Sequence, residues 1–224
     1  MGKPFKQELS NLNYSIEWSN NLDISKLKMS ILLYSNPIYF VGSGGSLSVC
    51  NYGVSLASKL GRIAKAVTPL ELYSLKNTIH NSSIIIISSS GNNKDILFAF
   101  KESLKEEPNQ IICICLNKNS KLKKLVSGNE FCDFFEFENP LGKDGFLATN
   151  SLLALFNILR RSFSLLNFDK PYIHLEDKLF HDKLEAFSKK ISNGYTLLIL
   201  FGPSEKSIAI GYRIKCSEAA LFPT

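Results

Sequence analysis

A run of four isoleucines at positions 84–87 constrains the fold more than any other feature of the sequence. Consecutive β-branched apolar residues are typical of a strand that is buried on both faces, as in a parallel sheet covered by helices. Serines and a glycine follow the run, and a helical pattern with Ile96, Leu97 and Phe100 begins near Asp95. The sequence therefore predicts a buried strand, a short polar loop and a helix in direct succession.

Small polar residues fill the loop between this strand and its helix. They are Ser88, Ser89, Ser90, Gly91, Asn92 and Asn93. At the carboxyl end of a parallel strand, backbone N–H groups and the positive end of the next helix dipole favour an anion. This loop is predicted to bind a phosphate through dipoles and hydroxyls. The same residue types are also common in loops and at helix N-caps that bind nothing, so this segment alone leaves both interpretations open.

Strand and helix patterns alternate along residues 37–166. Strands are expected at 38–41, 62–67, 84–87, 111–116 and 132–137, and helices at 46–60, 69–75, 95–106 and 146–166. This alternation predicts an α/β fold: an open parallel five-stranded sheet with helices on both faces, in a flavodoxin-like three-layer arrangement. Residues 1–35 are expected to form a leading helix that packs on this core.

A second, shorter pattern follows the long helix. Residues 168–195 are expected to form a linker and a helix, and residues 196–224 a strand and a helix that resemble the start of a second copy of the fold. One strand and one helix cannot form a domain alone, and their apolar surfaces need cover. The expected domains are thus 1–35, 36–167, 168–195 and 196–224, and we expect either a homo-oligomer or a natural chain that continues beyond Thr224.

Composition narrows the class of partner. Hydrophobic residues make up 45% and charged residues 21% of the 224 residues, as in a globular protein, and the net charge is +6. The densest basic patch lacks interleaved aromatic residues and is typical of a solvated surface, so no nucleic acid is expected as a partner. It consists of Lys118, Lys121, Lys123 and Lys124.

The cysteines and the apolar runs indicate where the protein resides. There are five cysteines, an odd number, and none form a C-x-x-C pair. Buried reduced thiols in a cytoplasmic protein are the expected interpretation, and no metal site is expected. No apolar run approaches membrane-spanning length and the amino terminus lacks a secretory apolar region, so no membrane partner is expected.

Two further glycine-rich segments stand where strands end. The first is Gly42-Ser43-Gly44-Gly45-Ser46, and the second is residues 142–150, directly before the long helix. A dinucleotide fold would need glycine at position 47, where Leu47 stands, and no Gly-Lys-Ser or Gly-Lys-Thr is present for a P-loop. No nucleotide cofactor is therefore expected. Loops at the carboxyl edge of one parallel sheet converge on the crevice where such sheets bind ligands.

Together, the three segments resemble the sugar isomerase (SIS) domain family, which includes the isomerase half of glucosamine-6-phosphate synthase. The matching positions are Gly42, Ser43 and Gly44 in the first loop; Ser88, Ser90, Gly91 and Asn93 in the second; and Gly145 to Asn150 in the third. Asn93 stands where the family has threonine, and Asn150 where lysine is usual. The resemblance covers roughly residues 35–167 and implies a phosphosugar or other carbohydrate derivative as ligand. The ligand and phosphate residues that we expect are Ser43, Gly44, Ser88, Ser89, Ser90, Asn93 and Thr149.

The resemblance leaves enzymatic activity uncertain. The acid/base glutamate, the ring-opening histidine and the lysine of the synthase correspond to positions beyond Thr224, and Glu218 does not match that glutamate. His80, His174 and His181 are expected to be surface or capping residues, and Asp144 to be structural. The main hypothesis is a sugar-phosphate-binding module. The alternatives are an aldose–ketose isomerase or deaminase completed beyond Thr224 or by a partner subunit, and a scaffold used only for protein contacts.

Overall fold

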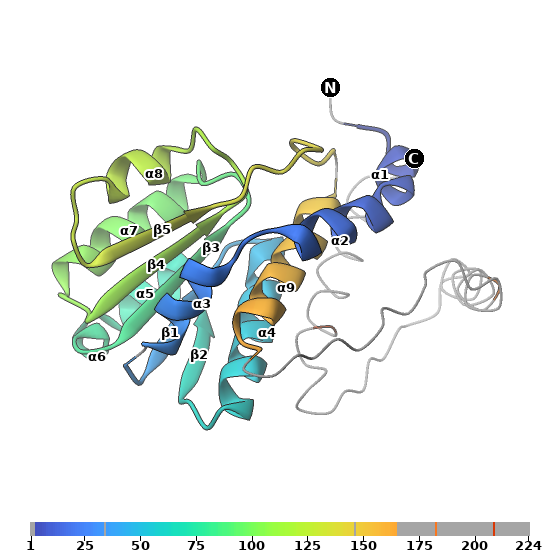
Figure 1. The fold of residues 1–224 in the computed structure, drawn as a ribbon. Coiled ribbons are helices and arrows are strands. Elements are labelled where there is room, and N and C mark those ends of the chain that lie inside the picture. The colour runs from blue at the N-terminus through green and yellow to red at the C-terminus, as the bar shows by residue number, and fades with distance from the viewer. Residues whose placement is uncertain (1–2, 34, 146, 165–181, 183–207, 209–224) are drawn as a thin grey trace, which may run out of the picture.

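The computed structural model describes residues 3–33, 35–145 and 147–164, together with the single positions 182 and 208 (Figure 1). Apart from those two positions, the expected linker and helix at 168–195 and the expected second copy at 196–224 lie outside the described residues. His174, His181 and Glu218 lie outside them as well.

Five parallel strands form one open sheet in the order β2-β1-β3-β4-β5 (Figure 1). The strands are β1 (Ile38–Val41), β2 (Ala64–Val67), β3 (Ser83–Ser88), β4 (Gln110–Cys115) and β5 (Cys132–Glu136). The predicted α/β fold with an open parallel five-stranded sheet is confirmed, and β5 is an edge strand as expected. The chain crosses from β2 over β1 to β3, so the strand order switches direction between β1 and β3. Ligands of open α/β sheets bind at such a switch point, outside the carboxyl ends of the strands.

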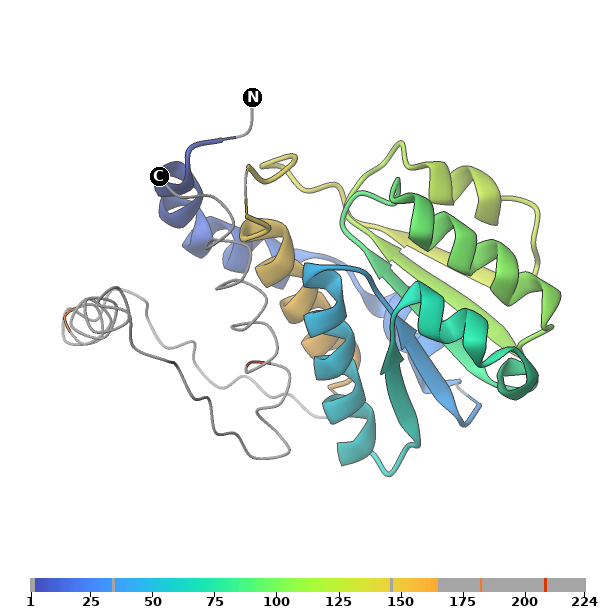
Figure 2. The ribbon, with the colours of Figure 1, turned by 180° about the vertical axis from the view of Figure 1, so that it is seen from behind.

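Helices cover both faces of the sheet (Figures 1 and 2). One face carries α3 (Ser25–Leu32), α4 (Gly45–Lys59) and α9 (Asn150–Ser162), and the other carries α5 (Pro69–Ser74), α6 (Lys76–Ile79), α7 (Lys94–Lys105) and α8 (Lys121–Val126). The leading helices α1 (Phe5–Ser10) and α2 (Leu12–Asn21) lie against α9, far from them in sequence. No helix in the described residues is long and apolar enough to cross a membrane.

The isoleucine run joins the two halves of the core. Ile85 and Ile87 belong to the cluster under α4 and α9, whereas Ile84 and Ile86 belong to the cluster under α7. All four are fully buried, as predicted from a run in which apolar and polar residues do not alternate. Helix α4 approaches the sheet closely, since a Cβ at Gly53 would stand 2.5 Å from the Phe40 ring.

Two expected helices differ from the observed ones. Residues 1–35 form three short helices instead of one, with breaks at Asn11 and at residues 22–24. The long helix begins at Asn150 rather than near residue 146 and ends at Ser162. Its start is displaced because the carboxylate of Asp144 accepts hydrogen bonds from the backbone N–H groups of Thr149 (2.9 Å) and Ser151 (3.0 Å). The sequence predicted an earlier start because apolar residues recur every three or four positions through this segment, which the contacts of Asp144 hold as a loop.

Candidate functional site at the carboxyl edge of the sheet

Three polar loops gather at the edge where the strands end. The first loop (residues 42–44) follows β1, the second loop (residues 89–93) follows β3, and the third loop (residues 139–149) lies between β5 and α9. Because β1 and β3 pair in parallel, with Val41 opposite Ile86, the first two loops flank the switch point of the sheet. The third loop meets α4: an added Cβ at Gly45 would lie 3.7 Å from the Ala148 side chain.

Internal hydrogen bonds shape the second loop. Ser88 is buried and its hydroxyl oxygen accepts a hydrogen bond from the Gly91 N–H at 3.1 Å. Ser90 is exposed, and its hydroxyl oxygen accepts from the Asn92 N–H at 3.2 Å. Asn93 is the N-cap of α7, because its side-chain oxygen accepts from the N–H groups of Asp95 (2.7 Å) and Ile96 (3.4 Å). Two hydroxyl hydrogens and the Asn93 amide NH2 can still be donated toward the crevice.

The loop between β4 and α8 holds the second loop from outside. The Leu116 N–H donates to the Ser89 carbonyl (3.1 Å), and the Leu122 N–H donates to the Gly91 carbonyl (3.0 Å). The Asn117 amide donates to the Ser90 carbonyl (3.0 Å), and the Lys121 N–H donates to the Asn92 side chain (2.9 Å). The second loop is therefore fixed by neutral groups before any ligand arrives. In the part of the chain that the structure describes, no carboxylate accepts a hydrogen bond from residues 88–93.

Only glycine fits at the centre of the second loop. Gly91 has a φ of +61°, a conformation that side chains rarely adopt. A Cβ there would stand 2.6 Å from the Ser120 Cβ and 2.8 Å from the Cys115 sulfur. The glycine thus allows the loop to pack directly on the β4–α8 connection.

The first loop leaves a helix N-terminus without a side-chain cap. Gly44 is the N-cap of α4, with a φ of +56° and a ψ of −132°, and no side chain caps the helix there. Gly44 is exposed and Ser43 is half-buried. One turn further, the buried hydroxyl of Ser48 has no hydrogen-bond partner among the described residues. The positive dipole end of this 15-residue helix therefore lies at the carboxyl edge of the sheet, next to the first loop.

Carboxylates occupy the third loop. Asp144 binds the backbone N–H groups at the start of α9, as described above, and also accepts from the Ser151 hydroxyl. The buried carboxylate of Glu8 accepts from the Gly145 N–H and, at 2.8 Å, from the Thr149 hydroxyl. Asp144 is structural, as expected. Thr149 lies at the edge of the sheet, but Glu8 and the Leu147 carbonyl (2.8 Å) already contact its hydroxyl.

Candidate acids, bases and nucleophiles are scarce near the three loops. His80 follows α6 at the opposite, amino edge of the sheet, where it is exposed and Nδ1 lies 3.3 Å from the Glu106 carbonyl oxygen. Burial raises the pKa of the Cys50 and Cys113 thiols, and it raises that of Cys132 to about 11. These thiols are protonated near neutral pH and are poor nucleophiles. The described residues contain no group of three side chains suited to a metal ion.

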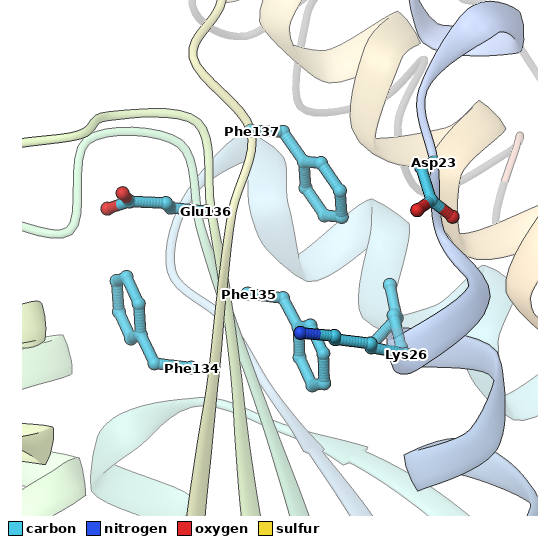
Figure 3. Close-up of a pocket in the computed structure, with 7 residues that line it drawn as sticks. Asp23, Lys26, Phe134, Phe135, Glu136 and Phe137 are labelled. Carbon is cyan, nitrogen blue, oxygen red and sulfur yellow. The ribbon is translucent and has the colours of Figure 1, made fainter.

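Among the described residues, two open hollows lie away from the three loops. One, of about 240 Å³, opens between α3 and the free edge of β5, where Lys26 lies beside Phe135 (Figure 3). The other, of about 320 Å³, lies on the α8 side of the same strand. Neither is lined by a residue of the expected phosphate site.

Sequence reasoning missed the residues that hold the loops in place. Glu8 contacts the third loop from a distant part of the chain, and Asn117, in the β4–α8 connection, contacts the second loop. Glu8 lies more than 130 positions before its partners in sequence. No local pattern in the sequence could have connected them.

The fold and the loop arrangement define a parallel three-layer α/β protein with polar loops at the β1/β3 switch point. Residues 31–127 match the family model of the SIS domain, the family that the loop motifs resemble. The model match ends before the third loop. No curated protein sequence matches the chain.

Solved structures of sugar-phosphate proteins share this fold. The tagatose-6-phosphate ketose/aldose isomerase of Escherichia coli superposes with a TM-score of 0.59 at 19% identity, covering 70% of this chain and 46% of that one. The NanR protein of Vibrio vulnificus, complexed with ManNAc-6P, gives 0.59 at 15% identity, covering 85% and 70%. The C-terminal domain of glucosamine-fructose-6-phosphate aminotransferase from Francisella tularensis gives 0.52 at 18%, covering 83% and 51%. The chain thus spans about half of the first and third of these proteins, and at these identities the likeness establishes the fold.

Proposed function

We propose that this protein binds a phosphorylated sugar or a related carbohydrate derivative in the crevice at the carboxyl edge of the sheet. The phosphate would lie on the second loop, at Ser88, Ser89, Ser90 and Asn93. Ser43 and Gly44 would flank it from the first loop, and Thr149 would lie at the rim.

The observation that carries this proposal is the way in which hydrogen bonds hold the second loop at a helix N-terminus. It is held rigidly by neutral groups, it keeps hydroxyl and amide donors, and it stands at the N-terminus of α7 and beside that of α4. Fixed donors and two helix dipoles directed at one place suit a dianion better than a neutral ligand. The SIS family model and the sugar-phosphate proteins that share the fold support the same ligand class.

Replacing Ser90 with alanine tests the phosphate site. Ser90 is exposed, so the loss of its hydroxyl should leave the free energy of unfolding nearly unchanged. It removes one hydrogen bond to a charged group, worth about 1.5–3 kcal/mol, so affinity for a sugar phosphate should fall roughly 10- to 100-fold. Calorimetric titration with fructose, glucose and glucosamine 6-phosphates measures this. Ser74→Ala, on an exposed serine of α5, is the matched control.

Two results would sink the proposal. In one, the wild-type protein binds none of the tested sugar phosphates. In the other, the Ser90→Ala protein binds its best ligand as tightly as the wild type does.

The alternative function is an aldose–ketose isomerase or a deaminase. The described residues would supply the phosphate-binding loop but no well-placed base, since His80 lies at the far edge and the carboxylates of Glu8 and Asp144 are engaged. The catalytic groups would then come from residues outside the described ones or from a partner subunit. Turnover of the same sugar phosphates by the wild-type protein would establish it. Assembly as a homo-oligomer and a cytoplasmic location stay predictions, and a monodisperse monomer by light scattering would contradict the first.

A further inference from the structure

Lys3 and Glu8, near the start of the chain, form hydrogen bonds with the third loop and the start of α9. Glu8 is 1% exposed, and its two carboxylate oxygens accept from the Gly145 N–H and the Thr149 hydroxyl. Its backbone carbonyl accepts from the Asn150 side chain at 3.0 Å, and the Lys3 ammonium group donates to the Leu141 carbonyl. A charged group that is this buried is stable only when its oxygens are bonded. The buried carboxylate of Glu8 therefore needs the hydrogen bonds of the third loop, and the loop needs Glu8 as their acceptor.

The shape of the third loop is fitted to this contact. A Cβ at Gly145 would stand 2.2 Å from the Lys3 carbonyl oxygen, so α1 can approach only because glycine stands there. Thr149 presents its hydroxyl to Glu8, and the next residue begins α9. On its other side the loop packs on the start of α4 through Ala148. Glu8 thus fixes one wall of the crevice from behind.

We infer that Glu8 is the positioning residue of the third loop: its buried carboxylate holds the loop in the conformation that contacts the sugar. This inference rests on the proposed function and assigns the phosphate and the sugar to different loops. The second loop binds the phosphate, and the third loop, whose Gly145 and Thr149 N–H groups are bonded to Glu8 and Asp144, contacts the sugar body. Glu8 itself does not touch the ligand.

The test compares Glu8→Ala with Glu8→Gln. Alanine removes both acceptors, so affinity for the best-bound hexose 6-phosphate should fall about tenfold, which corresponds to about 1.4 kcal/mol. Glutamine can accept from the Gly145 N–H and donate to the Thr149 oxygen while that hydroxyl donates to Leu147, so it should restore most of the affinity. Glu17→Ala, on an exposed glutamate of α2, is the control and should bind as the wild type does.

Inorganic phosphate separates positioning from general loosening of the fold. Affinity for inorganic phosphate, measured by NMR titration, should be unchanged in Glu8→Ala and reduced in Ser90→Ala. Equal losses for phosphate and for the sugar phosphate in Glu8→Ala would overturn the inference. Wild-type affinity of Glu8→Ala for the sugar phosphate would overturn it as well.

Amide hydrogen exchange gives a readout that needs no ligand. Residues 142–150 should exchange faster in Glu8→Ala than in the wild type, and at the wild-type rate in Glu17→Ala. If the wild type binds no sugar phosphate, the proposed function fails, and unchanged exchange in Glu8→Ala would overturn the positioning role separately. If Glu8→Ala does not fold, Thr149→Val removes the same hydrogen bond without altering α1. It should then give the same loss of affinity for the sugar phosphate, and wild-type affinity would overturn the inference.

Discussion

The second and third loops lie at the same edge of the sheet, but they satisfy their backbone N–H groups in opposite ways. In the second loop, neutral oxygens of Ser88, Ser90 and Asn93 accept from the backbone. In the third loop, the carboxylates of Glu8 and Asp144 do so. A loop capped by neutral groups keeps the positive potential of its helix, whereas a carboxylate cancels it. The comparison supports the proposal that the anion lies on the second loop, although Asp95 in the first turn of α7 reduces the positive potential there.

The two loops are also braced from different parts of the chain. The second loop is fixed by the β4–α8 connection, which follows it closely in sequence and belongs to the same sheet. The third loop depends on α1, at the very start of the chain. The proposed phosphate site is therefore part of the central fold, and the loop that we propose to contact the sugar depends on a peripheral element.

Replacing Gly91 with alanine should have the largest effect. The alanine would have to adopt a backbone φ of +61°, and its Cβ would stand 2.6 Å from the Ser120 Cβ. A left-handed conformation costs about 1–2 kcal/mol and overpacking about 1–3 kcal/mol more. Gly61→Ala is the matched control, because Gly61 has a φ of +71° with open space around it. Urea unfolding should show a clearly greater loss for Gly91→Ala, and equal losses would show that the second loop is not tightly braced.

Removing the carboxylate of Asp144 tests the third loop. Asp144→Ala leaves the N–H groups of Thr149 and Ser151 without their acceptor, at a cost of about 1.5–3 kcal/mol in the free energy of unfolding. Glu130→Ala, at an exposed glutamate, should change stability little. Affinity for a sugar phosphate should fall less in Asp144→Ala than in Ser90→Ala. The reverse order would place the phosphate on the third loop and end the distinction between the two.

Asn93 allows helix capping and anion binding to be separated within the second loop. Asn93→Asp keeps an oxygen that can accept from the Asp95 and Ile96 N–H groups, so thermal stability should be preserved. The added negative charge should repel a phosphate and lower affinity about tenfold or more. Asn93→Ala should instead lose about 1 kcal/mol of stability. An Asn93→Asp protein with unchanged affinity would show that the phosphate lies away from this helix N-terminus.

Much of the fold and part of the candidate site could be predicted from the sequence. The isoleucine run predicted β3 because a strand buried on both faces must be apolar throughout, and the structure buries all four residues. The Ser-Gly loops could be placed at one edge because parallel strands share their carboxyl end. The start of α9 could not be predicted, because hydrogen bonds from backbone N–H groups to the partly buried carboxylate of Asp144 overrode an apolar period that continued through the loop.

The remaining contacts depend on tertiary proximity. Asn93 could be recognised as an N-cap from its place before a helix, but Ser88 and Ser90 could not be seen to accept from their own loop. The contact between Glu8 and Thr149 joins residues 141 positions apart. Short-range patterns carry no information about such a pair, so its discovery required the structure.

The smallest predicted effect concerns a third helix N-terminus, that of α5. Thr68 and Glu71 form a capping box, in which the Thr68 N–H donates to the Glu71 carboxylate at 2.6 Å. This backbone hydrogen bond lowers the pKa of Glu71 below its ordinary value of 4.5. Because the folded pKa is the lower one, the carboxylate stabilises the fold above about pH 4.5, and that contribution is lost as the pH falls through the folded pKa. Glu71→Gln keeps an oxygen acceptor and removes only the charge, so at pH 7 it should cost on the order of 0.3 kcal/mol, given exposure and screening by salt. Urea unfolding at pH 7 and pH 3 should show that this cost is smaller in acid, and a cost that is equal at both pH values would show that the charge contributes nothing to this helix N-terminus.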